Sequence, residues 1–161
     1  MPYVLQARSG PGNLWVMRDH PGQPEYGDFL DANGESLYGL IADGRVEHLG
    51  FTPRFTRSNS GKLGDLLWTT GDMAKLASRR FVDVLEAVQA TGYRTFPVEV
   101  RGKRGEPIGD YVGFAVLDAD PDKDLRFELW YQGWSFVASD RVVDALKAAG
   151  VTELSVKRVT S

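Results

Sequence analysis

The stretch that decides the fold is ASRRFVDVLEA, residues 77–87, because the chain repeats it as ASDRVVDALKA at residues 138–148. Aligned at an offset of 61 residues, the two stretches share Ala, Ser, Arg, Val, Asp, Leu and Ala at the same positions. After a deletion of three residues, Gly92 aligns with Gly150. Each copy is typical of a helix that begins at a serine cap, ends at a glycine and leads into a strand. The repeat therefore predicts a scaffold and carries no chemistry of its own.

Hydrophobic periodicity predicts the elements on either side of the repeat. Apolar residues spaced three and four apart predict a helix over 73–90, either continuous or divided near Ser78, and a second helix over 139–149. Alternating or continuous apolar runs predict strands at 3–7, 14–17, 37–41, 46–49, 93–101, 108–117, 125–131, 134–137 and 151–159. We expect residues 111–117 to be a central strand covered on both faces, and Pro97 to mark an edge or a bulge.

These elements predict an α+β fold, in which two or three helices pack on a mostly antiparallel sheet that contains the internal repeat. A length of 161 residues is typical of one domain. We therefore expect a single domain over residues 1–161. Its first part, 1–64, is expected to be irregular and rich in strands and loops, and 65–161 is expected to form the repeat-containing core.

The balance of charge weighs mildly against a nucleic acid as a direct ligand. The net charge is −3 and the pI is about 5.4, whereas nucleic-acid-binding proteins usually carry a basic surplus or stripe. Arg54 with Arg57, and the segment 101–104, are short basic clusters that we interpret as solvated turns. An acidic balance allows a basic protein as a partner.

Cysteine is absent from the chain, which excludes disulfides, thiolate metal sites and a cysteine nucleophile. The beginning of the sequence lacks the basic-then-apolar pattern of a secretory signal. No apolar run approaches the ~20 residues that a membrane span requires. We expect a cytoplasmic protein that does not enter membranes.

Motifs for catalysis or cofactor binding are not found. His20 and His48 are the only histidines, and neither stands in an HExxH arrangement that would predict zinc. Residues 60–62, Ser-Gly-Lys, resemble the end of a phosphate-binding loop, but Thr56 and Leu63 stand where that loop requires Gly and Ser or Thr. We therefore predict no cofactor and no metal.

The acidic stretch 118–124, DADPDKD, is the most suggestive polar segment. A calcium-binding EF-hand loop would need Gly at Lys123 and Glu at Leu129, so that template fails. Two interpretations stay open: a solvated loop between strands, or an acidic prong that meets a basic partner surface.

The strand expected after this stretch carries further candidates. Trp130 shares its charged face with Arg126, and aromatic and arginine side chains are typical anchors of interfaces. Alternatively, Trp130 packs beneath a helix. The candidate partner-binding residues are Asp118, Asp120, Asp122, Asp124, Arg126 and Trp130.

A family resemblance rests on the same region. The helix and strand at 77–100, with Leu-Glu near the helix end and Phe-Pro-Val in the strand, are followed by the Tyr-led apolar strand 111–117. The helix that follows Phe136–Ser139 and a closing strand at Val156 complete the succession. This order resembles a bacterial family first described as a domain of unknown function and now grouped with the immunity proteins of polymorphic toxin systems. The resemblance covers about residues 65–159.

The resemblance implies a cytoplasmic, non-catalytic protein that binds and occludes a cognate toxin domain. No functional residue can be carried over, because the shared residues belong to the core. The alternative is a small enzyme with its site in the loops expected at 19–36 and 52–64, which are rich in Gly, Pro and polar residues. Tyr26 and Phe29 are candidate anchors of the first loop. A third hypothesis is self-association through an exposed sheet edge.

Overall fold

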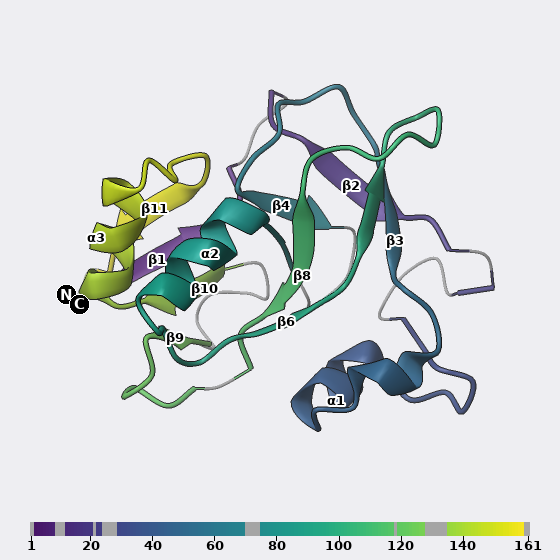
Figure 1. Cartoon of the computed structure of the whole chain (residues 1–161), viewed down its shortest axis with the longest axis horizontal. Helices are drawn as coiled ribbons and strands as arrows, with labels where there is room; N and C mark the ends of the chain where they lie inside the picture. Colours follow the sequence, from purple (N-terminus) through teal and green to yellow (C-terminus); the bar gives the residue numbers. More distant parts are fainter. Residues whose placement is uncertain are drawn as a thin grey trace.

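The computed structural model of the chain describes residues 2–8, 12–20, 22–23, 29–69, 75–117, 119–127 and 135–159. The strands are β1 (Tyr3–Gln6), β2 (Trp15–Arg18), β3 (Arg54–Arg57), β4 (Leu66–Thr69), β5 (Lys75–Ser78), β6 (Arg94–Phe96), β7 (Glu99–Arg101), β8 (Tyr111–Ala115), β9 (Leu125–Arg126), β10 (Ser135–Ala138) and β11 (Ser155–Arg158). The helices are α1 (Leu37–Ala42), α2 (Arg79–Ala87) and α3 (Asp140–Ala148), and a short 3-10 helix, η1 (Val46–Leu49), follows α1. The fold is α+β, as the sequence predicts (Figure 1).

The strands form two sheets. The first has the order β11-β1-β10-β9, and each neighbouring pair is antiparallel. The second has the order β6-β8-β5-β4-β2-β3-β7, in which the pairs β2–β4 and β3–β7 are parallel and the others antiparallel. Strand β1 lies inside the first sheet, and β2 and β3 lie inside the second. The first third of the chain therefore supplies interior strands to both sheets.

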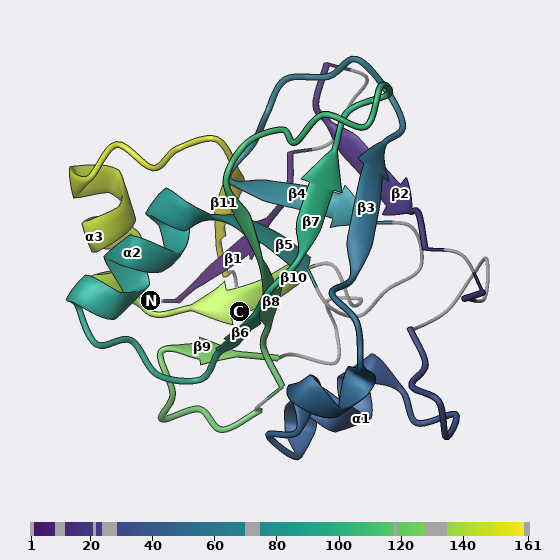
Figure 2. The same cartoon turned by 45° about the vertical axis from the view of Figure 1, so that its right-hand side comes forward.

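The second sheet curls until its edges approach each other. Its edge strands, β6 and β7, are separated in sequence only by Pro97 and Val98. Pro97 has no N–H to donate to a strand ladder, which explains why it stands between two edges. The N–H of Ile108 donates to the carbonyl of Val100 at 3.0 Å, which links the segment before β8 to β7. Figure 2 shows β7 and β8 crossing close to each other.

Helices α2 and α3 lie side by side and cover one end of the two sheets (Figures 1 and 2). Between them and the sheets lies the first hydrophobic core, which takes residues from both helices and from β1, β4, β5, β8 and β10. Its largest fully buried members are Leu5, Phe81, Leu85, Phe114, Leu125, Phe136 and Leu146. All five residues of β8 are buried, as expected for a central strand covered on both faces.

The second core lies against the other face of the curled sheet. It joins β-strand residues to α1, and its members include Leu14, Val16, Phe29, Leu37, Leu40, Phe55, Leu76 and Val100. Phe29 is fully buried there and anchors its loop as expected, whereas Tyr26 lies outside the described residues. Core residues thus come from parts of the chain that sequence patterns left irregular.

Two expected strands are helical instead. Residues 37–41 form α1, because the Ser36 hydroxyl accepts a hydrogen bond from the Gly39 N–H at 3.1 Å and caps a helix. Leu37, Leu40 and Ile41, at helical spacing, are its buried residues. Residues 46–49 form the 3-10 helix η1, which ends at Gly50 with a φ of 84°.

Two other segments are strands where the sequence predicts something else. The loop expected at 52–64 contains β3, which pairs with β2 and β7. The helix expected over 73–90 begins only at Arg79, and Lys75–Ser78 form β5, which pairs with β4 and β8. Short apolar runs fit either period, and here pairing on both sides decides for strand.

The helix ends also differ from the prediction. The sequence places the stop of the first repeated helix at Gly92, but the left-handed residue after α2 is Gln89, with a φ of 54°. Gly150, with a φ of 72°, occupies the equivalent position after α3. The N–H that follows each of them donates back to a leucine carbonyl of its helix at 2.9 Å. The offset of 61 residues therefore continues through both helix ends without a deletion.

Candidate partner-binding surfaces

Asp65 is a buried carboxylate at the N-terminus of α2. It lies just before β4, is 1% exposed, and accepts hydrogen bonds from the Ser78 hydroxyl at 2.6 Å and from Nε and Nη2 of Arg80 at 2.7 and 2.8 Å. The backbone N–H of Glu153 donates to its other side at 2.9 Å. Burial alone would raise the pKa of Asp65, but the hydrogen bonds from Arg80 and Ser78 outweigh burial and lower it. Asp65 joins α2, β4 and the segment before β11, so its role is structural.

Asp124 has the same arrangement at the N-terminus of α3. Its carboxylate accepts from the Ser139 hydroxyl at 2.8 Å and from Nε and Nη2 of Arg141 at 2.8 and 2.6 Å. The backbone N–H of Thr91 also donates to it, at 3.0 Å. Burial would raise the pKa of Asp124, but the hydrogen bonds from Arg141 and Ser139 outweigh it, and the pKa falls to about 2. The side chain of Asp124 is only 11% exposed, which leaves little of it for a partner.

The rest of the acidic stretch is more accessible. Asp122 is exposed and Asp120 is partly exposed, and the Asp120 carboxylate accepts from the Asp122 N–H at 2.9 Å in a tight turn. Arg126 lies on β9 opposite Val137 of β10. Asp118 and Trp130 lie outside the described residues. Among the candidates, therefore, Asp120 and Asp122 form an accessible acidic turn, and Asp124 is engaged in holding α3.

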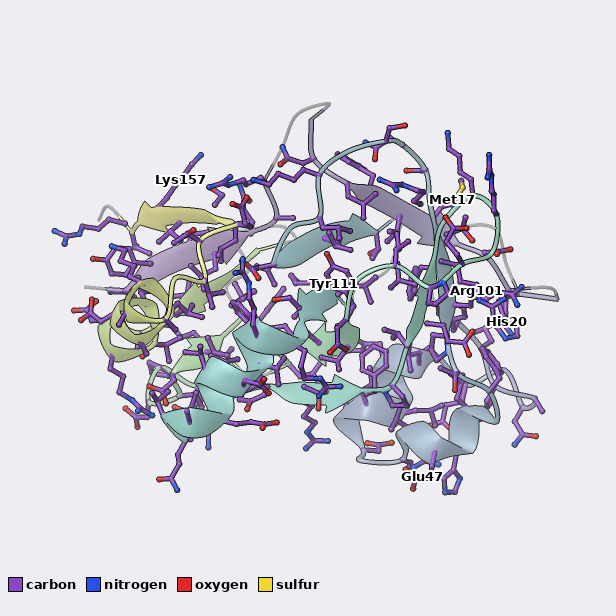
Figure 3. All side chains as sticks on the ribbon, turned by 45° about the horizontal axis from the view of Figure 1, so that its top comes forward. Met17, His20, Glu47, Arg101, Tyr111 and Lys157 are labelled. Atoms are coloured by element: carbon purple, nitrogen blue, oxygen red, sulfur yellow. The ribbon has the colours of Figure 1, made fainter. Side chains whose placement is uncertain are left out.

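The loops proposed for an enzyme site hold structural contacts in their described parts. Asp19 accepts a hydrogen bond from the Thr56 hydroxyl at 2.6 Å, and its backbone carbonyl accepts from Nε of Arg54 at 2.6 Å. The His20 ring lies against Phe51, with ring centroids 4.2 Å apart, on the same side of the molecule as Met17 (Figure 3). His48 is exposed beside Glu47. These contacts fix the loops to β3 and do not assemble a nucleophile with a base.

Lys75, like Asp65, is a buried charged residue to which the sequence analysis assigned no role. It begins β5, is 8% exposed, and its ammonium lies 5.9 Å from the centre of the Phe136 ring. Desolvation lowers its pKa to about 8. The apolar spacing that surrounds Lys75 predicted a helix, which gave no reason to expect its side chain inside the core.

A surface cavity of about 450 Å³ lies beside Asp65 and is lined by Leu63, Arg79, Arg80, Asp83, Asp110 and Tyr111. The Tyr111 hydroxyl donates to the Gly64 carbonyl at 2.7 Å, and burial raises the pKa of Tyr111 to about 12 (Figure 3). Arg79 faces Asp110 across 3.8 Å. Arg79 and Arg80 are thus paired with Asp110 and Asp65, and Tyr111 stays protonated at neutral pH.

One face of the second sheet carries exposed apolar side chains. Trp15 and Met17 of β2 are 36% and 46% exposed, and they alternate with the buried Leu14 and Val16. Met17 pairs with Thr56 of β3, and Thr56 pairs in turn with Arg101 of β7, so these three side chains share one face. We call the surface formed by Trp15, Met17, Arg54, Thr56, Glu99 and Arg101 the open face. Helices α1, α2 and α3 do not lie over it (Figure 1).

The open face brings together two basic clusters that are far apart in sequence. Arg54 lies on β3 and Arg101 on the neighbouring β7, which pairs with β3 in parallel, and the turn that carries Lys103 and Arg104 follows β7. Arg101 donates to Glu99 at 2.9 Å, and Arg54 lies 3.4 Å from the carboxylate of Asp19. Residues 14–17 are all apolar in the sequence, so no alternation of polar and apolar residues indicated that Trp15 and Met17 would be exposed.

Within the described residues, no cluster of three or more histidine, aspartate or glutamate side chains could hold a metal ion. None of the helices in this part of the chain is both long and apolar enough to cross a membrane. No protein-family model matches the sequence, and no curated protein matches it. The functional assignment therefore depends on the residues themselves.

Proposed function

We propose that this chain is a non-catalytic binding protein that neutralises a cognate toxin domain by covering it, as the family resemblance implies. Stable protein interfaces bury about 1,200–2,000 Å² in total, so a domain of this size offers enough surface for such a role. The chain needs no cofactor for this function.

The proposal rests on a contrast between two kinds of side chain. The carboxylates of Asp65 and Asp124 serve to hold helices, whereas exposed aromatic and apolar side chains lie on the open face. Asp65 and Asp124 each hold a helix N-terminus through a serine and an arginine. Exposed Trp15 and Met17, by contrast, make an aromatic and flexible apolar surface of the kind found in interfaces. This distribution is typical of a protein that binds by its surface.

The experiment first asks whether the gene lies directly downstream of one that encodes a large secreted protein with a toxin-like C-terminal domain, and then uses that protein. Its C-terminal domain is expressed alone and together with the full chain, and growth is followed. We expect the domain to arrest growth, co-expression to restore it, and the two proteins to elute as one complex in size-exclusion chromatography. A domain that arrests growth equally with and without this chain, and that elutes separately from it, contradicts the proposal.

A small enzyme is the second candidate, and Lys75 is the observation that favours it. A buried amine whose pKa is about 8 is partly unprotonated at neutral pH and can act as a base or nucleophile. Competitive acetylation followed by mass spectrometry measures whether reagents reach this amine. If the Lys75 amine reacts faster than that of the exposed Lys157, the enzyme hypothesis is supported. If the Lys75 amine does not react in the folded chain, the enzyme hypothesis loses its support.

A further inference from the structure

We infer that the open face is the docking surface of the protein, and that it takes an acidic protein surface with an apolar centre. This inference rests on the proposed function and names the partner's chemistry. It differs from the acidic-turn hypothesis, because a partner of the acidic turn at Asp120 and Asp122 would be basic.

The apolar centre comes from β2. Trp15 and Met17 project from the same face of an interior strand, so their backbone is held by hydrogen bonds to β3 and β4 on both sides. A rigid backbone lowers the entropy lost when a partner binds. Tryptophan is among the residues that dominate binding energies, and methionine is enriched in interface centres. The open face thus has the composition of an interface core.

The polar groups of the open face are held in place before binding. Asp19 accepts from the Thr56 hydroxyl at 2.6 Å, and its carbonyl fixes the Arg54 guanidinium, also at 2.6 Å. The Glu99 carboxylate accepts a hydrogen bond from Nη2 of Arg101 at 2.9 Å. Each arginine is thus balanced by a carboxylate and contributes no surplus charge.

The surplus charge comes from the turn that follows β7. Lys103 and Arg104 are exposed and form no ion pair with another described residue. The turn that carries them is closed by the Gly102 N–H, which donates to the Glu106 carbonyl at 2.7 Å, and the Glu106 carboxylate accepts from the Arg104 N–H at 3.0 Å. Because the exposed carboxylate of Glu106 lies in the same turn, Lys103 and Arg104 leave one surplus positive charge at the rim of the open face, although the whole chain carries a net charge of −3.

Charge complementarity identifies the occupant. A second copy of this chain would bring the same cations to the rim, and like charges repel. A nucleic acid would match the cations and could stack on Trp15, but proteins that bind single strands line an extended groove with positive charge, whereas the surplus positive charge here is confined to one turn of a chain whose net charge is −3. A partner protein whose apolar side chains are surrounded by carboxylates would complement both the apolar centre and the basic rim of the open face.

The test measures binding of the upstream C-terminal domain by surface plasmon resonance, using the full chain and two pairs of variants. Met17→Glu is compared with Tyr38→Glu, since both side chains are exposed but Tyr38 lies on α1. Lys103→Glu is compared with Lys157→Glu, an exposed lysine of β11 on the opposite side of the molecule from Met17 (Figure 3). Melting curves establish that each variant is folded.

We expect Met17→Glu to weaken binding at least tenfold, that is by about 1.4 kcal/mol, and Tyr38→Glu to leave it unchanged. Lys103→Glu should slow association about threefold or more at low salt, whereas Lys157→Glu should not. If the wild type binds and Met17→Glu binds equally well, the inference is overturned and the proposed function stands.

Two other outcomes also decide. If the wild-type chain does not bind the domain, the proposed function is wrong and the inference falls with it. Binding of a thymidine 20-mer that Met17→Glu abolishes would show a single-stranded nucleic acid on the open face, and would overturn the acidic protein partner.

Discussion

Asp65 and Asp124 hold equivalent positions at the N-termini of two different helices. Each carboxylate receives two hydrogen bonds from one arginine guanidinium and one from the serine two residues before that arginine. Asp65 stands 13 residues before its serine and Asp124 stands 15 before its own. The shared Ser and Arg of the two stretches are therefore half of a network whose other half lies outside the repeat.

The first prediction concerns Asp65→Asn. The amide cannot accept all the hydrogen bonds that the buried carboxylate accepts, and it leaves the guanidinium of Arg80 without its counter-charge. We expect the free energy of unfolding to fall by about 3 kcal/mol, measured by urea denaturation. Asp83→Asn on the exposed face of α2 is the matched control and should change stability by less than ~0.5 kcal/mol. Equal effects of the two variants would show that the network contributes nothing.

The second prediction concerns the stability of the fold at acidic pH. The pKa of Asp124 is about 2 in the folded chain, against an ordinary value of 3.8. Its contribution to stability is therefore complete above pH 4 and is lost as the pH falls toward 2. After allowance for screening at the exposed guanidinium of Arg141, we expect a loss of about 1–2 kcal/mol over this window. In Asp124→Asn this part of the loss should be absent, and an unchanged acid profile in the variant would contradict the assignment.

The third prediction concerns the stability of the fold at alkaline pH. The pKa of Lys75 falls from 10.5 to about 8 on folding, so between these values the unfolded chain keeps a proton that the folded chain has released. The Lys75 contribution to the free energy of unfolding therefore increases with pH across this window, by about 3 kcal/mol. Lys75→Met should remove the increase, and the exposed control Lys157→Met should retain it. A rise of the same size in both variants would exclude Lys75 as its source.

Tyr111 acts with the opposite sign at higher pH. Burial raises its pKa from 10.0 to about 12, so its contribution is complete below pH 10 and is lost as the pH rises toward 12. Stability followed by urea denaturation should therefore pass through a maximum near pH 10. In Tyr111→Phe the decline above pH 10 should be smaller, and an identical decline would contradict this assignment.

The fourth prediction concerns the end of α2. Gln89 adopts a left-handed backbone with a φ of 54°, a conformation that costs about 1 kcal/mol for a residue with a Cβ. We expect Gln89→Gly to raise the free energy of unfolding by about 0.5–1 kcal/mol. Gly150→Gln at the equivalent position of α3 should lower it by about 1 kcal/mol. Thermal denaturation measures both, and shifts of the same sign would contradict the equivalence of the two helix ends.

The fifth prediction concerns the acidic turn. If a basic partner binds there, changing Asp120 and Asp122 to Lys should slow association by roughly tenfold with little effect on dissociation. Surface plasmon resonance with the upstream C-terminal domain measures both rates. Unchanged association would remove the acidic turn from the account and leave the open face as the docking surface.

The sequence was sufficient where the pattern was local. Ser78 and Ser139 begin their helices, and the fully buried β8 follows from a run that is apolar on both faces. The strand predictions for residues 37–41 and 46–49 were wrong, because short apolar runs suit either a strand or a helix. At α1, the cap at Ser36 favoured the helix. The open face could not be predicted, because it depends on the pairing of β2, β3 and β7, which are far apart in the chain.

By itself, the sequence determined the α+β class, the two helices that begin after Ser78 and Ser139, and the absence of any cysteine chemistry. These are set by periodicity, by cap residues and by composition, which act over a few residues at a time. Only the tertiary structure decided that Asp65 and Asp124 are helix anchors, and that Met17 and Arg101 share a surface. Strand order and register fix these relationships, because hydrogen bonding between strands joins residues whose separation in sequence carries no local signal.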